Sequence, residues 1–86
     1  MTQPSNYTTA DIGKLIRNTR KTLGVTQKEL ALTSGTGLRF IIELEKGKET
    51  IEMGKVLTVL NTLGITMSLT PPAAVAAEGS GDGANA

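Results

Sequence analysis

The chain has 86 residues, nine of them Lys or Arg and eight Asp or Glu, and it contains neither Cys nor His. Without these two residue types there can be no disulfide, no thiolate or imidazole metal ligand and no histidine general base. We therefore expect no catalytic residue, no metal site and no cofactor. The length suits one domain, and a core this small is often completed by association with a second copy.

Positive charge is concentrated in the middle of the chain. Between Lys14 and Lys48 there are eight Lys and Arg against three Glu, an excess of five positive charges. Such a segment favours a polyanionic partner, although charged side chains also simply solvate helix faces. The apolar runs are too short to span a bilayer, and the N-terminus lacks the pattern of a signal peptide. We therefore expect a cytoplasmic protein without membrane association.

The first predicted element is a helix that follows a flexible arm. Residues 1–7 show no periodic pattern and form the arm. Thr8 with Asp11 three positions later is typical of a helix N-cap and Gly24 of a C-cap, which predicts a helix from about Ala10 to Leu23. The positions that recur at helical spacing along it are Ile12, Leu15, Ile16, Thr19 and Leu23.

Two short helices follow, separated by a glycine turn. Thr26 and Glu29 form a Thr-x-x-Glu capping box at the start of the second helix. The segment Gly35-Thr36-Gly37 ends that helix, and the third helix begins at once, at roughly Gly37 to Lys46. So tight a turn forces the two helices to cross at a steep angle.

A fourth helix is predicted from about Ile51 to Leu63, with Thr50 as its cap and Gly64 as its end. Its predicted buried positions are Ile51, Val56, Leu57, Leu60 and Leu63.

The segment after the fourth helix alternates apolar and polar residues, which is typical of a short half-buried strand. Since no second strand is predicted, its amides and carbonyls lack partners within the chain. Pairing with the same strand of a second copy would satisfy them, and the alternative is an irregular extended segment lying over the helices. The predicted strand and dimer seam comprise Ile65, Thr66, Met67, Ser68 and Leu69.

The domain organisation that follows has three parts. These are the arm at 1–7, a folded domain at 8–70, and a tail at 71–86. The tail opens with two prolines and continues with Ala, Gly and polar residues, a composition that predicts disorder.

The second and third helices carry a specific motif. Residues 24–31 match the pattern Gly-x-Thr-Gln-x-x-Leu-Ala, a glycine turn follows, and residues 41–47 match Ile-x-x-Leu-Glu-x-Gly. This arrangement resembles the XRE family of helix-turn-helix proteins, which includes the phage Cro and repressor domains, over about residues 10–64. The resemblance implies an all-α, lambda-repressor-like bundle of four to five helices that binds DNA, acting at the bacterial nucleoid.

The third helix can be divided into two faces by angle. If Ile41 points into the core, Leu44 and Glu45 lie on the same side, while the first residues of the helix enter the major groove in this motif. Arg39 is the best candidate for a base contact, because a guanidinium can bond guanine O6 and N7 together. Leu38 and Ile42 would contact thymine methyl groups.

The remaining polar residues of the motif are assigned to phosphates, to a base or to structure. Glu43 repels phosphates unless it accepts from a cytosine amine or orients Arg39 one turn away. Gln27, with a side chain free to point outward, would bridge a phosphate and the protein at the start of the second helix. The family resemblance also implies a structural ion pair between Arg20 and Glu45. The full set of expected DNA contacts is Gln27, Lys28, Gly37, Leu38, Arg39, Ile42, Glu43, Lys46 and Lys48.

Residues 56–69, a helix leading directly into a Leu/Ile-x-Met-x-Leu strand, resemble the HipB type of antitoxin within this family. That resemblance implies a homodimer that binds a palindromic operator, represses its own operon, and neutralises a HipA-like Ser/Thr kinase toxin in a type II toxin–antitoxin module. Two alternatives remain: a stand-alone phage-type regulator, and a protein-binding adaptor without a DNA function. No feature favours an enzyme.

Overall fold

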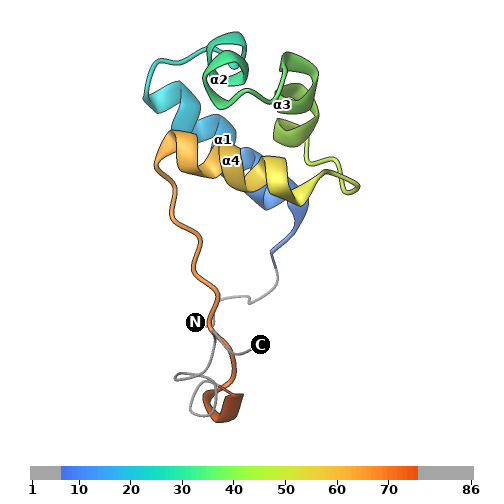
Figure 1. Cartoon of the computed structure of the whole chain (residues 1–86), viewed down its shortest axis with the longest axis vertical. Helices are drawn as coiled ribbons and strands as arrows, with labels where there is room; N and C mark the ends of the chain where they lie inside the picture. Colours follow the sequence, from blue (N-terminus) through green and yellow to red (C-terminus); the bar gives the residue numbers. More distant parts are fainter. Residues whose placement is uncertain (1–6, 76–86) are drawn as a thin grey trace.

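The computed structural model describes residues 7–75, so the predicted arm, except for Tyr7, and the predicted tail beyond residue 75 lie outside the described residues. Besides a short helical turn at residues 73–75, the described residues form the helices α1 (Thr9–Thr22), α2 (Gln27–Ser34), α3 (Leu38–Glu45) and α4 (Met53–Leu63). α2 and α3 lie above α1 and α4 (Figure 1). The predicted all-α bundle is confirmed, and none of the described helices is long and apolar enough to cross a membrane.

The first two helices begin at reciprocal caps. The Asp11 amide donates to Thr8 Oγ1 at 3.1 Å, and the Thr8 amide donates to Asp11 Oδ2 at 2.9 Å. Thr26 and Glu29 make the same pair of bonds at the start of α2, at 2.9 and 3.0 Å. Because these bonds occupy amides that lack a partner within the helix, they fix where each helix begins. Both predicted capping residues are therefore confirmed.

The start of α4 differs from the prediction. The helix begins at Met53 and its cap position is Glu52, which makes no side-chain capping bond. Thr50 is not the cap, because residues 48–52 form an open connection in which neither Thr50 nor Ile51 is helical. The prediction placed the start two residues too early.

The core is a single aliphatic cluster to which α1 contributes one side chain and the other three helices two or three each. Within α4 the buried stripe is Val56, Val59 and Leu60, whereas Leu57 is 43% exposed. Leu57 was wrongly predicted as buried and Val59 was missed, because both are apolar and the rotation of α4 against α1 and α2 decides which of them faces the core. The complete buried set is Ile16, Leu30, Ala31, Ile41, Leu44, Val56, Val59 and Leu60.

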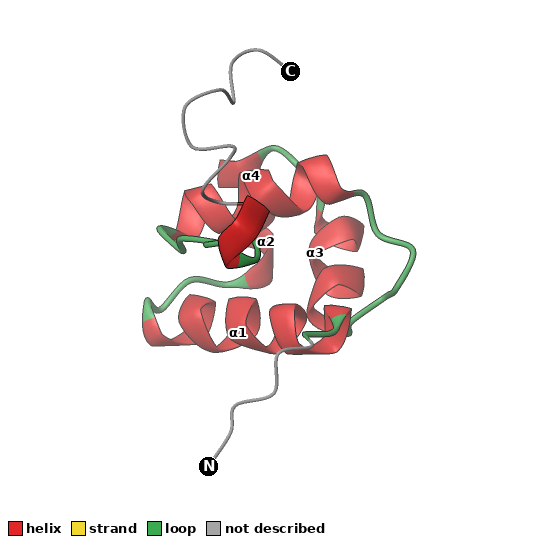
Figure 2. Cartoon of the chain, turned by 90° about the horizontal axis from the view of Figure 1, so that it is seen from below, coloured by secondary structure: helices red, strands yellow, loops and turns green. Residues whose placement is uncertain are grey.

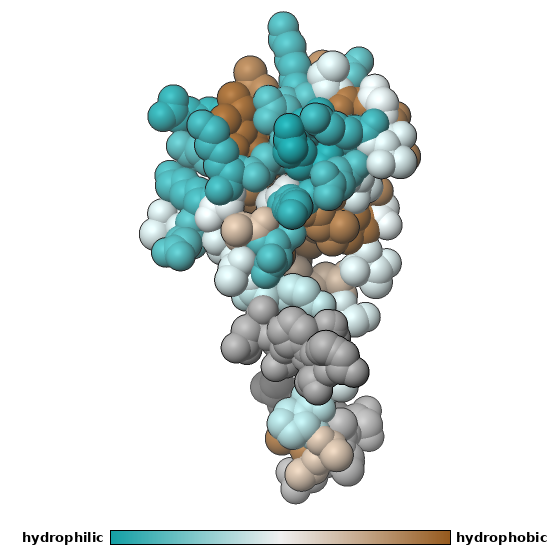
Figure 3. All heavy atoms as spheres, turned by 180° about the vertical axis from the view of Figure 1, so that it is seen from behind, coloured by the Kyte–Doolittle hydropathy of each residue, from teal (hydrophilic) through white to brown (hydrophobic). Residues whose placement is uncertain are grey.

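Apolar side chains that the core does not accommodate remain on the surface. Leu15 of α1 and Leu23 just after it, two of the positions that recur at helical spacing, are about half exposed, at 49% and 56%. Figure 3 shows brown apolar patches that interrupt a largely polar face of the bundle.

The segment after α4 leaves the bundle. Ile65 still packs against the core, whereas residues 66–70 are exposed and Leu69 reaches 84% exposure. The chain runs away from α2 and α3 and reaches a helical turn at residues 73–75, within the segment for which composition predicts disorder (Figure 1). No β-strand occurs among residues 7–75, and the segment does not lie over the helices. Its pairing with a second copy remains a prediction.

α1 approaches the end of α3 closely, and two glycines allow it. From below, α1 and α4 run along opposite sides of the bundle and α3 lies between them at one end (Figure 2). A Cβ at Gly13 of α1 would collide with the carbonyl oxygen of Leu44 and lie 3.0 Å from that of Glu45. Gly47, at a φ of +83°, packs against Ala10, and its carbonyl accepts from Thr9 Oγ1 at 2.7 Å.

A buried ion pair joins the same two helices. Arg20 Nε donates to Glu45 Oε2 at 2.6 Å and Nη2 donates to Glu45 Oε1 at 3.0 Å, with the side chains only 9% and 3% exposed. Nη1 of Arg20 donates to the Val25 carbonyl at 2.9 Å, and Gln27 Nε2 donates to Glu45 Oε1 at 3.0 Å. The hydrogen bond to Glu45 raises the pKa of Arg20. This arrangement links α1, the start of α2 and the end of α3.

The first prediction concerns Gly13. Gly→Ala in a helix interior normally stabilises by about 1 kcal/mol. At Gly13 the new methyl group meets backbone, so Gly13→Ala is expected to destabilise by about 1–3 kcal/mol. Gly54→Ala is the matched control, because its Cβ would meet only Glu52 Oε2 at 3.7 Å and the substitution should stabilise. Urea unfolding measures both. Equal stabilisation by the two variants would contradict the close approach of α1 to α3.

The second prediction concerns the ion pair. Glu45→Ala leaves Arg20 buried without its counter-charge and is expected to reduce the free energy of unfolding by about 3–5 kcal/mol. The double variant Arg20→Met, Glu45→Met buries no charge and is expected to recover much of that loss. Glu52→Ala, which removes an exposed carboxylate, is the control and should change stability little. A double variant as unstable as Glu45→Ala would show that charge burial is not the cause.

Candidate nucleic-acid interface

The α2–turn–α3 unit is shaped by two glycines with left-handed backbones. Gly35 ends α2 at a φ of +71°, and Gly37 precedes α3 at a φ of +94°, a region that side-chain-bearing residues rarely adopt. As the cap of α3, Gly37 makes no side-chain hydrogen bond. The first amides of α3 are therefore not capped by a side chain at this position.

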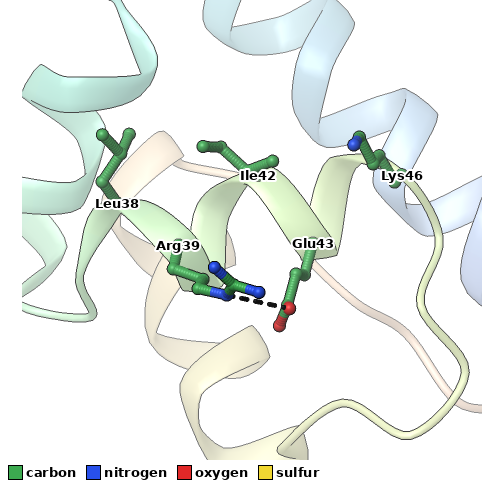
Figure 4. Close-up of a pocket in the computed structure, with 5 residues that line it drawn as sticks. All are labelled: Leu38, Arg39, Ile42, Glu43 and Lys46. Atoms are coloured by element: carbon green, nitrogen blue, oxygen red, sulfur yellow. Dashed lines mark hydrogen bonds and ion pairs between the residues drawn. The ribbon is translucent and has the colours of Figure 1, made fainter.

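α3 presents one face to the core and another to solvent. Ile41 and Leu44 are fully buried, at 0% and 2% exposure. On the opposite side the Arg39 side chain is 88% exposed and Leu38 is 42% exposed. Figure 4 shows Leu38, Ile42 and Lys46 in a row along α3, with Arg39 and Glu43 beside that row. The apolar anchor and the solvent-facing side chains thus share one eight-residue helix.

Two shallow grooves border the solvent face of α3. One, of about 330 Å³, is lined by Leu38, Arg39, Ile42, Glu43 and Lys46. The other, of about 360 Å³, lies towards α2 and is lined by Lys28, Ala31, Leu32, Gly35, Gly37 and Leu38. Leu38 lines both grooves and forms the ridge between them. Seven of the nine expected DNA contacts therefore lie around one surface.

Glu43 contacts two cations at this surface. Oε2 accepts from Arg39 Nε and Oε1 accepts from Lys48 Nζ, each at 3.3 Å. The hydrogen bond from Lys48, together with that from Arg39, lowers the pKa of Glu43, so the carboxylate stays ionised at neutral pH. Lys46 is exposed and takes part in no ion pair within residues 7–75.

Gln27 lies elsewhere than expected. Its side chain was predicted to be free to point outward, but Nε2 donates to the buried carboxylate of Glu45. The expected free outward orientation is wrong, because the end of α3 comes close enough to the start of α2 for the amide to hydrogen-bond Glu45. The protein half of the predicted bridge is therefore present, and the phosphate contact of Gln27 remains a prediction. Gln27 is half-buried and lines neither groove.

Two features of the surface were missed. Leu32 is 83% exposed and lines the second groove, although its place in the sequence of a short helix suggested no role. The pairing of Lys48 with Glu43 depends on Gly47, whose positive φ turns the chain back after α3. Residue spacing within a helix does not predict a contact between side chains on the two sides of such a turn. No group of three acidic, His or Cys residues that could hold a metal occurs among the described residues.

The comparisons with known proteins agree with this geometry. The chain matches the helix-turn-helix domain family over residues 13–68. It is 52% identical over 65 residues to y4mF, an uncharacterized HTH-type transcriptional regulator of Sinorhizobium fredii, covering 76% of this chain and 86% of that protein. The solved HipB–O4 20mer complex is similar at a TM-score of 0.70 and 22% identity, covering 80% of this chain and 97% of HipB. The HipA–HipB–O2–O3 complex gives the same TM-score and identity.

At 22% identity the structural similarity shows a shared fold. The family match, by contrast, spans more than half of the chain. The chain therefore belongs to the XRE-type helix-turn-helix family of DNA-binding transcriptional regulators, and its fold is that of HipB.

Proposed function

We propose that α3 binds an operator in the major groove and that the protein represses transcription of its own operon from there. The observation that carries the proposal is the solvent face of α3. It places an 88% exposed Arg39 side chain beside the apolar ridge of Leu38, at the start of the helix. A guanidinium specifies guanine and an apolar side chain fits a thymine methyl group, so this face can distinguish base pairs.

Affinity and register would come from the cations around this face. Lys28 borders the groove on the α2 side, and Lys46 the groove on the solvent side of α3. Lys48 follows directly in the chain, after the turn at Gly47. Contacts from such residues to phosphates position a protein on DNA without selecting a sequence.

The proposed working unit is a homodimer on a palindromic operator. Residues 65–69 alternate apolar and polar side chains, leave the bundle, and make no strand pairing within residues 7–75. Pairing of this segment with its own copy would satisfy its backbone and hold two copies of α3 in a fixed relation.

A further part of the proposal is an antitoxin role with a HipA-like Ser/Thr kinase as the partner. Its support is that the fold similarity covers 97% of HipB and that HipB is found in a complex with HipA and DNA. Co-purification of the chain with the product of an adjacent kinase-like gene tests this part. A stand-alone regulator would have no such neighbour, and an adaptor would lack salt-sensitive binding to its own promoter.

The third prediction concerns base recognition. Arg39→Ala is expected to reduce discrimination at one base pair of each half-site by about 1–3 kcal/mol, because it removes the bidentate guanine contact. Lys46→Ala is the matched comparison. It should weaken binding equally on all sequences and reduce the slope of log affinity against log salt by about 1. Fluorescence anisotropy on a set of single-base operator variants measures both. Unchanged discrimination in Arg39→Ala would contradict base reading by this residue.

The fourth prediction concerns the dimer. Thr66→Pro and Ser68→Pro remove backbone donors from the predicted strand and are expected to shift the protein to monomer. Thr66→Ala and Ser68→Ala keep the amides and should leave the dimer intact. Sedimentation equilibrium distinguishes these states, and dimers of unchanged affinity in both proline variants would place the interface elsewhere.

A further inference from the structure

Glu43 is the one acidic residue that lines either groove at the α3 surface. A carboxylate here opposes phosphate binding, since each phosphate carries a negative charge. It is 30% exposed, and its two oxygens are divided between Arg39 and Lys48. The residue therefore holds two of the cations that the proposed function assigns to DNA, one to a base and one to a phosphate.

Arg39 and Lys48 differ in the hydrogen-bond donors that each has left for DNA while it contacts Glu43. Arg39 donates through Nε at 3.3 Å, and among the described residues neither of its terminal nitrogens makes a hydrogen bond. The guanidinium can therefore stay on Glu43 through Nε, as in Figure 4, and still have its two terminal nitrogens available as donors. Lys48 has a single ammonium group, which donates to Glu43 Oε1 at 3.3 Å, so the carboxylate offsets its positive charge and holds the group beside Glu43.

We propose, on the basis of the DNA-binding function above, that Glu43 is a specificity-determining residue that acts by positioning Arg39 and by restraining Lys48 from the phosphates of non-operator DNA. On the operator, Arg39 bonds a guanine while its Nε remains on Glu43, and the carboxylate stays compensated. On other DNA, Arg39 finds no guanine at that place. To reach a phosphate it must leave Glu43, and the exposed carboxylate then faces the backbone.

The expected effect is a lower affinity for non-operator DNA. Both ion pairs lie at the surface, where such pairs contribute little to folding, so their value to the protein is not structural. The lowered pKa of Glu43 keeps the charge in place across the neutral pH range. Selectivity is thus built partly from a repulsive element, as specific interfaces commonly are.

Glu43→Gln tests the inference. Its affinity for a random-sequence duplex is expected to rise roughly tenfold at low salt, with a salt slope steeper by about 1 for each additional phosphate that the protein neutralises. Operator affinity should change less, so the ratio of operator to random binding falls. Adding Lys48→Met to Glu43→Gln should remove about one unit of that increase in slope, whereas Lys48→Met alone should change the slope less.

Glu52→Gln is the control, because it removes the same charge from an exposed residue that lines neither groove. Circular dichroism and urea unfolding establish that each variant is folded. A structural role alone would not raise the affinity for random DNA. The inference is overturned if Glu43→Gln keeps the wild-type random-DNA affinity and slope, or only matches Glu52→Gln. If the wild type itself shows no salt-dependent preference for any DNA sequence, the proposed function fails instead.

Discussion

The buried contact between Arg20 and Glu45 is the constraint on which the placement of the DNA-binding helix depends. Glu45 is the last residue of α3, and its carboxylate accepts from Arg20 of α1 and from Gln27 of α2. Because a charge this deeply buried must be compensated, only a narrow range of positions is open to the end of α3. Gly13 allows the backbones to come close enough for the pair to form. We expect the interaction to contribute more to a unique arrangement than to net stability, since replacing a buried ion pair by apolar side chains is often neutral or stabilising.

This anchoring has a consequence for the solvent face of α3. With Ile41 and Leu44 in the core, Phe40 packed against it and Glu45 held at the far end, the side chains on the solvent face are not needed to hold the helix in place. Arg39 can therefore be almost fully exposed, and Gly37 can replace a side-chain cap without loosening the helix from the bundle. A rigid support with few exposed side chains suits base recognition, since a small displacement would misplace every contact. The arrangement of the side chains around Glu43 can then depend on their charges rather than on packing against the core.

Much of this arrangement was predictable from patterns within single helices. The errors concern side chains whose position depends on contacts with residues far away in the sequence. The Thr26–Glu29 cap and the burial of Ile41 depend on spacings within one helix, which a sequence displays directly. The orientation of Gln27 depends on the position of Glu45, eighteen residues away. In α4, the choice of Val59 rather than Leu57 depends on how the helix is rotated against α1 and α2, which hydropathy alone does not determine when both residues are apolar.

The direction in which the chain leaves the bundle links this geometry to the proposed dimer. One short α3 presents few side chains and reads few base pairs, so a single copy would find its site on many sequences by chance. In Figure 1 the segment after α4 departs on the side opposite α2 and α3. Association through residues 65–69 would therefore leave both DNA-binding faces uncovered. In the proposed dimer, the rigidity that Arg20 and Glu45 impose within each copy sets the spacing between the two copies of α3. That spacing must match one helical turn of DNA, or a multiple of it, for both to enter the major groove.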